Sequence, residues 1–179
     1  MPVYVALLRG INVGGGNKIA MTELRALADE LGWKRAETYI QSGNLLFQAA
    51  DERAKLEMAL ETGIRRRFGL DIPAIVRAAV EWPALVAANP FPEPGEAEPN
   101  RLMLLLSKQP PGPEAAAALQ ERARDGERVA IAGGALWIHH AGGAGRSKLT
   151  PVLIDRLVGS PTTARNWRTV LKLQEMLGR

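Results

Sequence analysis

The chain has 179 residues, of which 46% are hydrophobic, and a net charge of +4, as expected for one domain or two small fused units with a packed core. The absence of cysteine excludes a disulfide framework, a thiol nucleophile and a thiolate metal site. No apolar run approaches the ~18 residues of a membrane span, and the N-terminus reads as a strand and not as a signal peptide, so we expect a cytoplasmic protein without a membrane partner.

The first half of the chain predicts the element order βαββαβ. The stretch "VYVALLRGI" is apolar and β-branched, as in a buried strand, and "MTELRALADELG" has a helical stripe that Thr22 can cap. A hairpin follows in "ETYIQSGNLLFQ", with a two-residue turn at Gly43-Asn44 or, alternatively, at Ser42-Gly43. A helix over 51–69 and a strand over 71–78 complete the pattern, which is the ferredoxin-like plan.

The second half repeats this order after a short helix that ends at Asn89-Pro90 and a Pro-rich, acidic linker over 92–100. We expect a strand over 101–108, a helix over 112–126, a hairpin around Gly133-Gly134 and a helix over 147–159. No final strand is evident, and a helix capped by Thr162 or Thr163 is expected in its place. The predicted fold is α+β, a duplication of two ferredoxin-like subdomains, 1–91 and 101–179, that form one cooperative unit and end in a C-terminal helix.

The ferredoxin-like topology predicts one cluster of polar groups in the first half. Strand one pairs with strand three in this plan, so the loop after strand one should lie beside the hairpin turn. Glycines in that loop allow a ligand to approach the backbone, and their N–H groups can face an anion. The alternative is that these are ordinary turn residues. The predicted cluster is Arg9, Asn12, Gln41, Ser42 and Asn44.

A second polar cluster is predicted near the C-terminus, where the charge is concentrated. Residues 1–144 carry 16 Lys and Arg against 17 Asp and Glu, whereas residues 145–179 carry 7 against 2. Such asymmetry can mark an anionic partner or a solvated helix face. The stretch "HAGGAGRSK" precedes a helix but fails the P-loop pattern, and "RGINVGG" fails the dinucleotide fingerprint. Arg146, Ser147 and Lys148 remain candidates for an anion site, as do Arg165 and Asn166 in the expected first helical turn, where a cation is unfavourable without an anion.

Catalytic and metal-binding patterns are scarce. His139 and His140 are adjacent in an expected strand and therefore point to opposite faces, so no metal site is predicted. Ser42 and Ser147 have no assigned histidine and acid partners, which leaves the question of enzymatic activity and the cofactor open.

Five ordered motifs, "LRGINVGG", "YIQSGNLLF", "NPF", "GRSKL" and "TTARNWRTVLKL", resemble the DUF1697 family of bacterial proteins of unknown function. The resemblance covers nearly the whole chain and implies two similar ferredoxin-like subdomains, without an established activity, cofactor or catalytic residue. Its polar signature maps onto Arg9, Asn12, Gln41, Ser42, Asn44, Arg146, Ser147, Lys148, Thr163, Arg165, Asn166 and Trp167.

Three functions are compatible with these patterns. The sequence favours a protein that binds a small phosphorylated or nucleotide-like anion, either as a binding protein or as an enzyme. A nucleic-acid-binding protein is less favoured, because the first 144 residues are nearly neutral and only 5% of residues are aromatic. An interaction or scaffold module is the third, and a homodimer is compatible with any of them.

Overall fold

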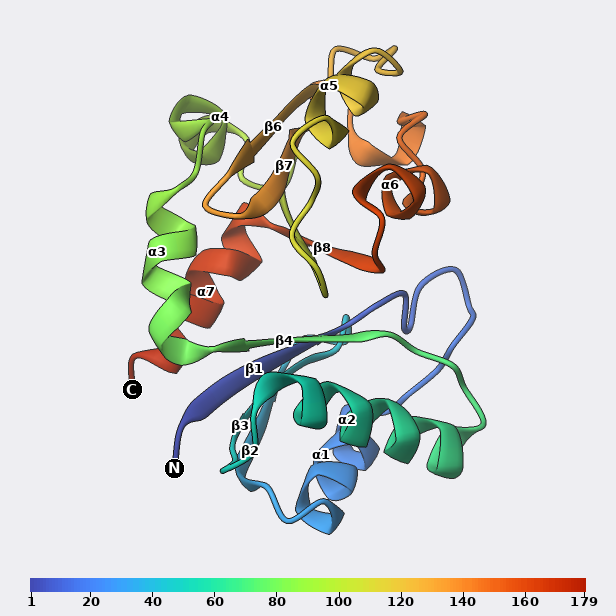
Figure 1. Cartoon of the computed structure of the whole chain (residues 1–179), viewed down its shortest axis with the longest axis vertical. Helices are drawn as coiled ribbons and strands as arrows, with labels where there is room; N and C mark the ends of the chain where they lie inside the picture. Colours follow the sequence, from blue (N-terminus) through green and yellow to red (C-terminus); the bar gives the residue numbers. More distant parts are fainter. The chain divides into compact units, whose positions relative to one another are not determined.

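Two four-stranded antiparallel sheets organise the chain, one in each of two units (Figure 1). The computed structural model describes all 179 residues. The first unit comprises Met1–Trp82 with Glu175–Arg179, and the second comprises Pro83–Gln174. No helix combines the length and the apolar character that a bilayer span requires.

The first unit is a complete βαββαβ structure with the strand order β2-β3-β1-β4, as the sequence predicts. All neighbouring strands are antiparallel. The elements in chain order are β1 (Val3–Leu8), α1 (Met21–Glu30), β2 (Lys34–Tyr39), β3 (Asn44–Gln48), α2 (Arg53–Phe68), β4 (Ala74–Ala78) and the 3₁₀ helix η1 (Ala79–Glu81).

One face of this sheet is covered by α1 and α2 (Figure 1). The helices bury their apolar stripes against alternate residues of the strands, because side chains repeat every second residue along a strand. At one end of this core the Trp33 ring stacks on Phe47, with 4.0 Å between ring centroids. The core includes Ala6, Leu8, Leu24, Leu27, Leu45, Phe47, Leu56, Leu60, Ile64 and Val76.

The second unit has the same arrangement, with the strand order β6-β7-β5-β8. Leu119 from α5 and Ile154 from α6 pack on Leu105, Leu136 and Ile138 of the sheet. The elements of this part of the chain are α3 (Trp82–Ala87), α4 (Pro92–Ala97), β5 (Leu102–Ser107), α5 (Ala115–Gln120), β6 (Arg128–Ala132), β7 (Ala135–His139), η2 (Ala144–Arg146), α6 (Pro151–Val158), β8 (Thr162–Asn166) and α7 (Trp167–Leu177).

The end of the second unit differs from the sequence-based expectation. Residues Thr162–Asn166 form strand β8, and the terminal helix begins only at Trp167. The β-branched Thr162 and Thr163 favour a strand, and β8 pairs with β5 from Met103 to Ser107. The expectation of a helix capped by one of these threonines is therefore wrong. The second unit contains the full βαββαβ order, so the duplication is more complete than the sequence indicates.

The two hairpins differ in the length of their turns. Tyr39 pairs with Asn44, so residues 40–43 form a four-residue turn between β2 and β3, and the expected two-residue turn is wrong. Ala132 pairs with Ala135, so Gly133 and Gly134 form a two-residue turn between β6 and β7, as predicted. Both glycines have positive φ, 60° and 72°, as a type I′ turn requires.

Residues 92–100, which the sequence indicates as a linker, contain α4 and belong to the second unit. Pro92 is compatible with this short helix, because it occupies the first turn, where the missing N–H costs little.

We expect a fragment of residues 1–91 to unfold at a lower temperature and less sharply than the whole chain. A fragment of this size buries a smaller share of its surface on folding than the whole chain does, so its core alone gives it less stability. Differential scanning calorimetry of the fragment and of the whole chain measures this difference. A fragment that is soluble and melts as sharply as the whole chain at a similar temperature would contradict the predicted cooperative unit.

Candidate functional site

The glycine loop, defined here as residues 9–20, connects β1 to α1 and is held by its own hydrogen bonds. The N–H of Asn12 donates to the carbonyl of Asn17 over 3.1 Å, and the N–H of Gly16 donates to the carbonyl of Val13 over 3.2 Å. Its backbone adopts left-handed conformations that glycine and asparagine tolerate best. These conformations occur at Gly10, Asn12, Gly14, Gly15 and Asn17. The residue composition of the loop thus follows in large part from its backbone geometry.

Asn12 joins the glycine loop to the β2–β3 hairpin. Its Nδ2 donates to the carbonyls of Ile19 (2.9 Å) and Gln41 (2.8 Å), and its Oδ1 accepts the N–H of Ile19 (2.9 Å). The juxtaposition of the two segments that the topology predicts is therefore confirmed. Both N–H groups of the Asn12 amide are used within the protein, so this side chain positions the loop.

The hairpin turn is closed by a second asparagine. Asn44 is fully buried at the start of β3, and its Nδ2 donates to the Tyr39 carbonyl (2.9 Å) and to Ser42 Oγ (3.1 Å). Ser42 is half-buried, whereas Gln41 is exposed. Directly after β1, Arg9 is half-buried, and its N–H donates to the Pro73 carbonyl over 3.1 Å. The turn therefore presents Gln41 to solvent on a rigid frame.

A pocket of about 440 Å³ lies between the glycine loop and this turn. It is lined by Asn12, Gly15, Lys18, Ile19, Ala20 and Gln41. Lys18 is exposed, and no carboxylate pairs with it. Sequence reasoning missed Lys18, although it directly follows the run of glycines and Asn17. A lysine at the end of such a loop is the signal that could have identified it.

The N-terminus of α1 also opens at this pocket. Ala20, which lines the pocket, is the N-cap residue of α1, and no side chain accepts a hydrogen bond from the first helical turn. The sequence-based assignment of Thr22 as the cap is wrong, because the helix already begins at Met21. A helix N-terminus carries a partial positive charge, and its first N–H groups have no partner within the helix. The pocket therefore combines this charge with the Lys18 ammonium group.

In the second unit, Ser147 is bound to a buried carboxylate. Its Oγ donates to Glu127 Oε1 over 2.6 Å and accepts the N–H of Leu149 over 3.1 Å. Burial opposes ionisation of Glu127, but the hydrogen bond from Ser147 and those from backbone N–H groups, including Arg124 and Asp125, outweigh it and lower its pKa to about 2. Ser147 therefore fixes the loop before α6 onto the start of β6.

The two other residues predicted in this loop, Arg146 and Lys148, are exposed. The helix that follows them is already capped, since Thr150 Oγ1 accepts the N–H of Leu153 over 3.3 Å. The N-terminus of α6 therefore has fewer unpaired N–H groups for an anion than that of α1, which has no side-chain cap. Arg146 and Lys148 thus supply positive charge on an exposed loop, and neither lines the glycine-loop pocket.

The residues at the start of the terminal helix have roles other than those predicted. Arg165 lies in β8, where it pairs with Leu104, and not in the first turn of a helix. It is buried, which lowers its pKa to about 10, and its Nη1 donates to Thr163 Oγ1 and to the Ala164 carbonyl, each over 2.8 Å. Asn166 caps α7 by accepting the N–H of Thr169 over 2.9 Å. The predicted conflict between a cation and the helix dipole does not arise.

The histidines lie next to each other at the end of β7, and both are buried. His139 Nε2 is 2.8 Å from Glu98 Oε2. Burial lowers the pKa of His140, while the nearby charge of Glu127 opposes this change. No three side chains of the types that bind metals come together in a group that could hold an ion.

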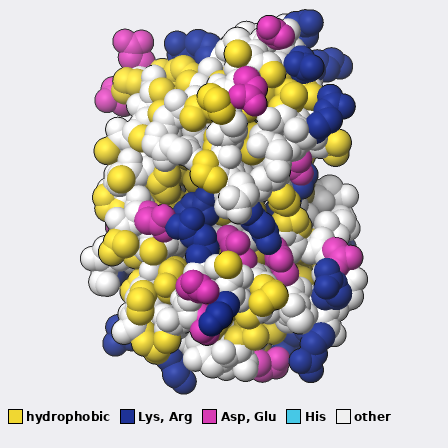
Figure 2. Space-filling view, in the orientation of Figure 1, with side chains coloured by type: hydrophobic (Ala, Val, Ile, Leu, Met, Phe, Trp, Pro, Cys, Tyr) yellow, Lys and Arg dark blue, Asp and Glu magenta, His cyan; other side chains and the backbone are white.

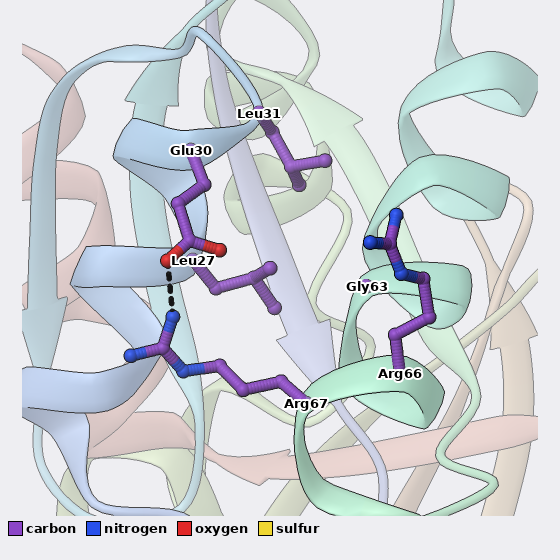
Figure 3. Close-up of a pocket in the computed structure, with 6 residues that line it drawn as sticks. All are labelled: Leu27, Glu30, Leu31, Gly63, Arg66 and Arg67. Atoms are coloured by element: carbon purple, nitrogen blue, oxygen red, sulfur yellow. Dashed lines mark hydrogen bonds and ion pairs between the residues drawn. The ribbon is translucent and has the colours of Figure 1, made fainter.

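A second pocket, of about 430 Å³, lies between α1 and α2 in the first unit (Figure 3). Its edge is formed by Arg67, which pairs with Glu30 and, over 2.6 Å, with Glu23. Gly63 is required for the close approach of the two helices, because a Cβ atom there would lie 2.8 Å from Leu27 Cδ1. These features account for helix packing, so the glycine-loop pocket remains the candidate site.

The fold and the glycine loop define an α+β protein built from two ferredoxin-like units. A family model described as "Protein of unknown function (DUF1697)" matches residues 1–137, and the chain belongs to this family. Among solved structures, that of the conserved bacterial protein SP0830 from Streptococcus pneumoniae is similar over 98% of both chains, with 26% sequence identity and a TM-score of 0.76. The comparison with curated proteins gave no match.

Proposed function

We propose that the protein binds a small phosphorylated or nucleotide-like anion in the pocket between the glycine loop and the β2–β3 turn. The observation that carries this proposal is the presence of three anion-binding features in one pocket: the Lys18 ammonium group, the uncapped N-terminus of α1 and the backbone of Gly15. Oriented backbone N–H groups and a helix N-terminus together favour phosphate oxygens. Lysine adds a mobile point charge.

The size of the pocket supports a small organic anion. A volume of about 440 Å³ falls within the roughly 300–1,000 Å³ typical of small-molecule sites. The exposed amide of Gln41 can both donate and accept, so it can recognise a hydroxyl, an amide or a base edge on the organic part of the ligand. Asn12 holds the glycine loop against the β2–β3 turn, and Asn44 closes that turn, so the two segments that form the pocket are fixed by hydrogen bonds.

The exposed Arg146 and Lys148, on a loop of the second unit, remain a separate candidate pair for binding an anion. Arg165 does not, because its guanidinium is buried in β8 and its truncation would test folding and not binding. Nucleic acid is a weaker candidate partner. On the face drawn in Figure 2, basic side chains are interspersed with acidic and apolar ones and do not form one broad basic surface.

We expect Lys18→Ala to weaken binding of the anion at least tenfold, because it removes the one side-chain cation of the pocket. A thermal-shift screen against phosphate, sulfate, sugar phosphates and nucleotides identifies the ligand. An anion present at ~100 times its Kd should stabilise the fold by about 2.7 kcal/mol. Isothermal titration of the wild type and the variant then measures the affinity.

The matched control is Lys34→Ala, which removes an exposed lysine from β2 of the same unit. It should bind the anion as the wild type does, whereas equal losses in both variants would mean a non-specific charge effect. Binding unchanged in Lys18→Ala would refute the site. Arg146→Ala and Lys148→Ala should bind this anion as the wild type does, because neither residue lines the pocket. Tight, sequence-selective binding of an oligonucleotide at physiological salt would instead favour a nucleic-acid-binding function.

A further inference from the structure

Ile40 has a backbone conformation that its residue type disfavours. It is the first residue of the β2–β3 turn and has a φ of 49°. A β-branched side chain in the left-handed region clashes with its own backbone, which glycine or asparagine would avoid. The three other non-glycine residues with positive φ are Asn12, Asn17 and Arg35, and none of them is β-branched.

The folded structure gains little from this isoleucine. Its side chain is 47% exposed and is not part of the apolar core between the first sheet and its helices. Strain that packing does not repay is found most often at functional positions. Ile40 directly precedes Gln41, whose side chain lines the glycine-loop pocket and whose carbonyl is held by Asn12.

A second exposed apolar residue lies in the glycine loop, next to Asn12, the residue that holds the Gln41 carbonyl. Val13 follows Asn12 at the tip of the glycine loop and is 67% exposed. The hydrogen bond between Asn12 and Gln41 thus brings together two segments that each carry an exposed, β-branched side chain. Neither side chain lines the pocket itself, but each directly neighbours a lining residue, Asn12 or Gln41. Exposed apolar groups in such positions provide contact area for an apolar part of a ligand.

We propose that Ile40 determines the specificity of the pocket, and that the ligand is a phosphate monoester whose organic part has an apolar or aromatic face. This inference rests on the proposed anion site. The phosphate group contacts Lys18 and the N-terminus of α1, and the organic group packs on Ile40 with Val13 beside it. A ligand contact at Ile40 would account for the retention of this strained conformation next to Gln41, which lines the pocket.

The test uses the whole chain and two probes, inorganic phosphate and phenyl phosphate, which differ by an apolar ring. The wild type should bind phenyl phosphate about tenfold more tightly than phosphate. Ile40→Asn should remove most of this preference and leave phosphate affinity unchanged. The same variant should melt about 3 °C higher, because asparagine tolerates the left-handed conformation. The control Val80→Asn removes an apolar side chain that is 87% exposed elsewhere in the unit, and should change neither quantity.

Each other outcome counts against the inference in a recognisable way. Phosphate binding without a preference for phenyl phosphate would refute the apolar contact and leave the anion site standing. If Ile40→Asn lowered the affinity for both probes equally, Ile40 would affect binding only through the conformation of the turn and not by contacting the organic group. A lower melting temperature of this variant would refute the strain argument. Failure of the wild type to bind either probe would refute the anion site itself, and this inference with it.

Discussion

Replacing Glu127 with Gln is expected to destabilise the protein by about 2 kcal/mol at pH 7 and by almost nothing near pH 2. Glu127 is buried and accepts hydrogen bonds from Ser147 Oγ and from the backbone N–H groups of Arg124 and Asp125. Glutamine has nearly the same shape, but it lacks the charge and can accept through only one of its two terminal atoms. The variant therefore removes the charge together with one acceptor of these hydrogen bonds.

The expected pH dependence follows from the lowered pKa of Glu127, which is about 2 in the folded protein against 4.5 ordinarily. A lowered pKa means that the folded state favours the charged form, so the stabilisation is fully present above the unfolded-state value. It is lost as the pH falls from about 4.5 towards 2. The difference in unfolding free energy between the wild type and Glu127→Gln should accordingly shrink over this range.

Urea unfolding of both proteins at a series of pH values from 7 to 2.5 measures this difference. Glu96→Gln is the control, because Glu96 is exposed in the same unit and its replacement should give no difference at any pH. A constant gap between the wild type and Glu127→Gln across the whole range would show that the carboxylate is not preferentially ionised in the folded state. Ser147→Ala should give a smaller gap, since it removes one of the bonds to this carboxylate.

Much of the fold could be predicted from local patterns in the sequence. The helices α1 and α2 show apolar stripes and β1 is a continuous apolar run, so the order of elements in the first unit was predicted correctly. The contact between the glycine loop and the hairpin turn also followed, because the pairing of β1 with β3 brings residues near 12 and 41 to the same end of the sheet.

The remaining features depend on interactions between residues that are distant in sequence. Strand β8 was missed because "TTARN" is short and runs directly into the periodic pattern of α7, whereas its pairing with β5 stabilises it as a strand. Ser147 was predicted as a ligand-binding residue because the sequence does not reveal its actual partner. That partner, Glu127, is twenty residues earlier in the chain. Lys18 was overlooked because an exposed lysine in a loop is unremarkable until a pocket is found beside it.

Replacing Gly43 with Ala is expected to destabilise the first unit by about 3 kcal/mol. Gly43 closes the β2–β3 turn with a φ of 84°, which alanine disfavours by roughly 1 kcal/mol. A Cβ atom at this position would also lie 2.7 Å from Ile11 Cδ1 and 2.8 Å from Leu8 Cβ. Ile11 can rotate its terminal methyl group away, but Leu8 Cβ is fixed to the backbone of β1, so the turn itself must move.

Gly32→Ala separates the steric effect from the conformational one. Gly32 follows α1 in the same unit with a φ of 79°, and no atom lies within 4 Å of the position that its Cβ would occupy. This control should lose only about 1 kcal/mol, so the excess in Gly43→Ala, about 2 kcal/mol, measures the overlap with β1. Urea unfolding compares the three proteins, and equal losses would mean that the turn is free to shift.

A shift of the turn also has a consequence for the pocket. The Gln41 carbonyl is held by Asn12 over 2.8 Å, and Leu8 N–H donates to the Gly43 carbonyl over the same distance. Movement of the turn away from β1 lengthens both hydrogen bonds and displaces the wall that carries Ile40 and Gln41. Gly43→Ala should therefore weaken binding of phenyl phosphate even under conditions where the protein remains folded, whereas Gly32→Ala should not. Unchanged affinity in a folded Gly43→Ala variant would mean that this turn does not form a wall of the binding site.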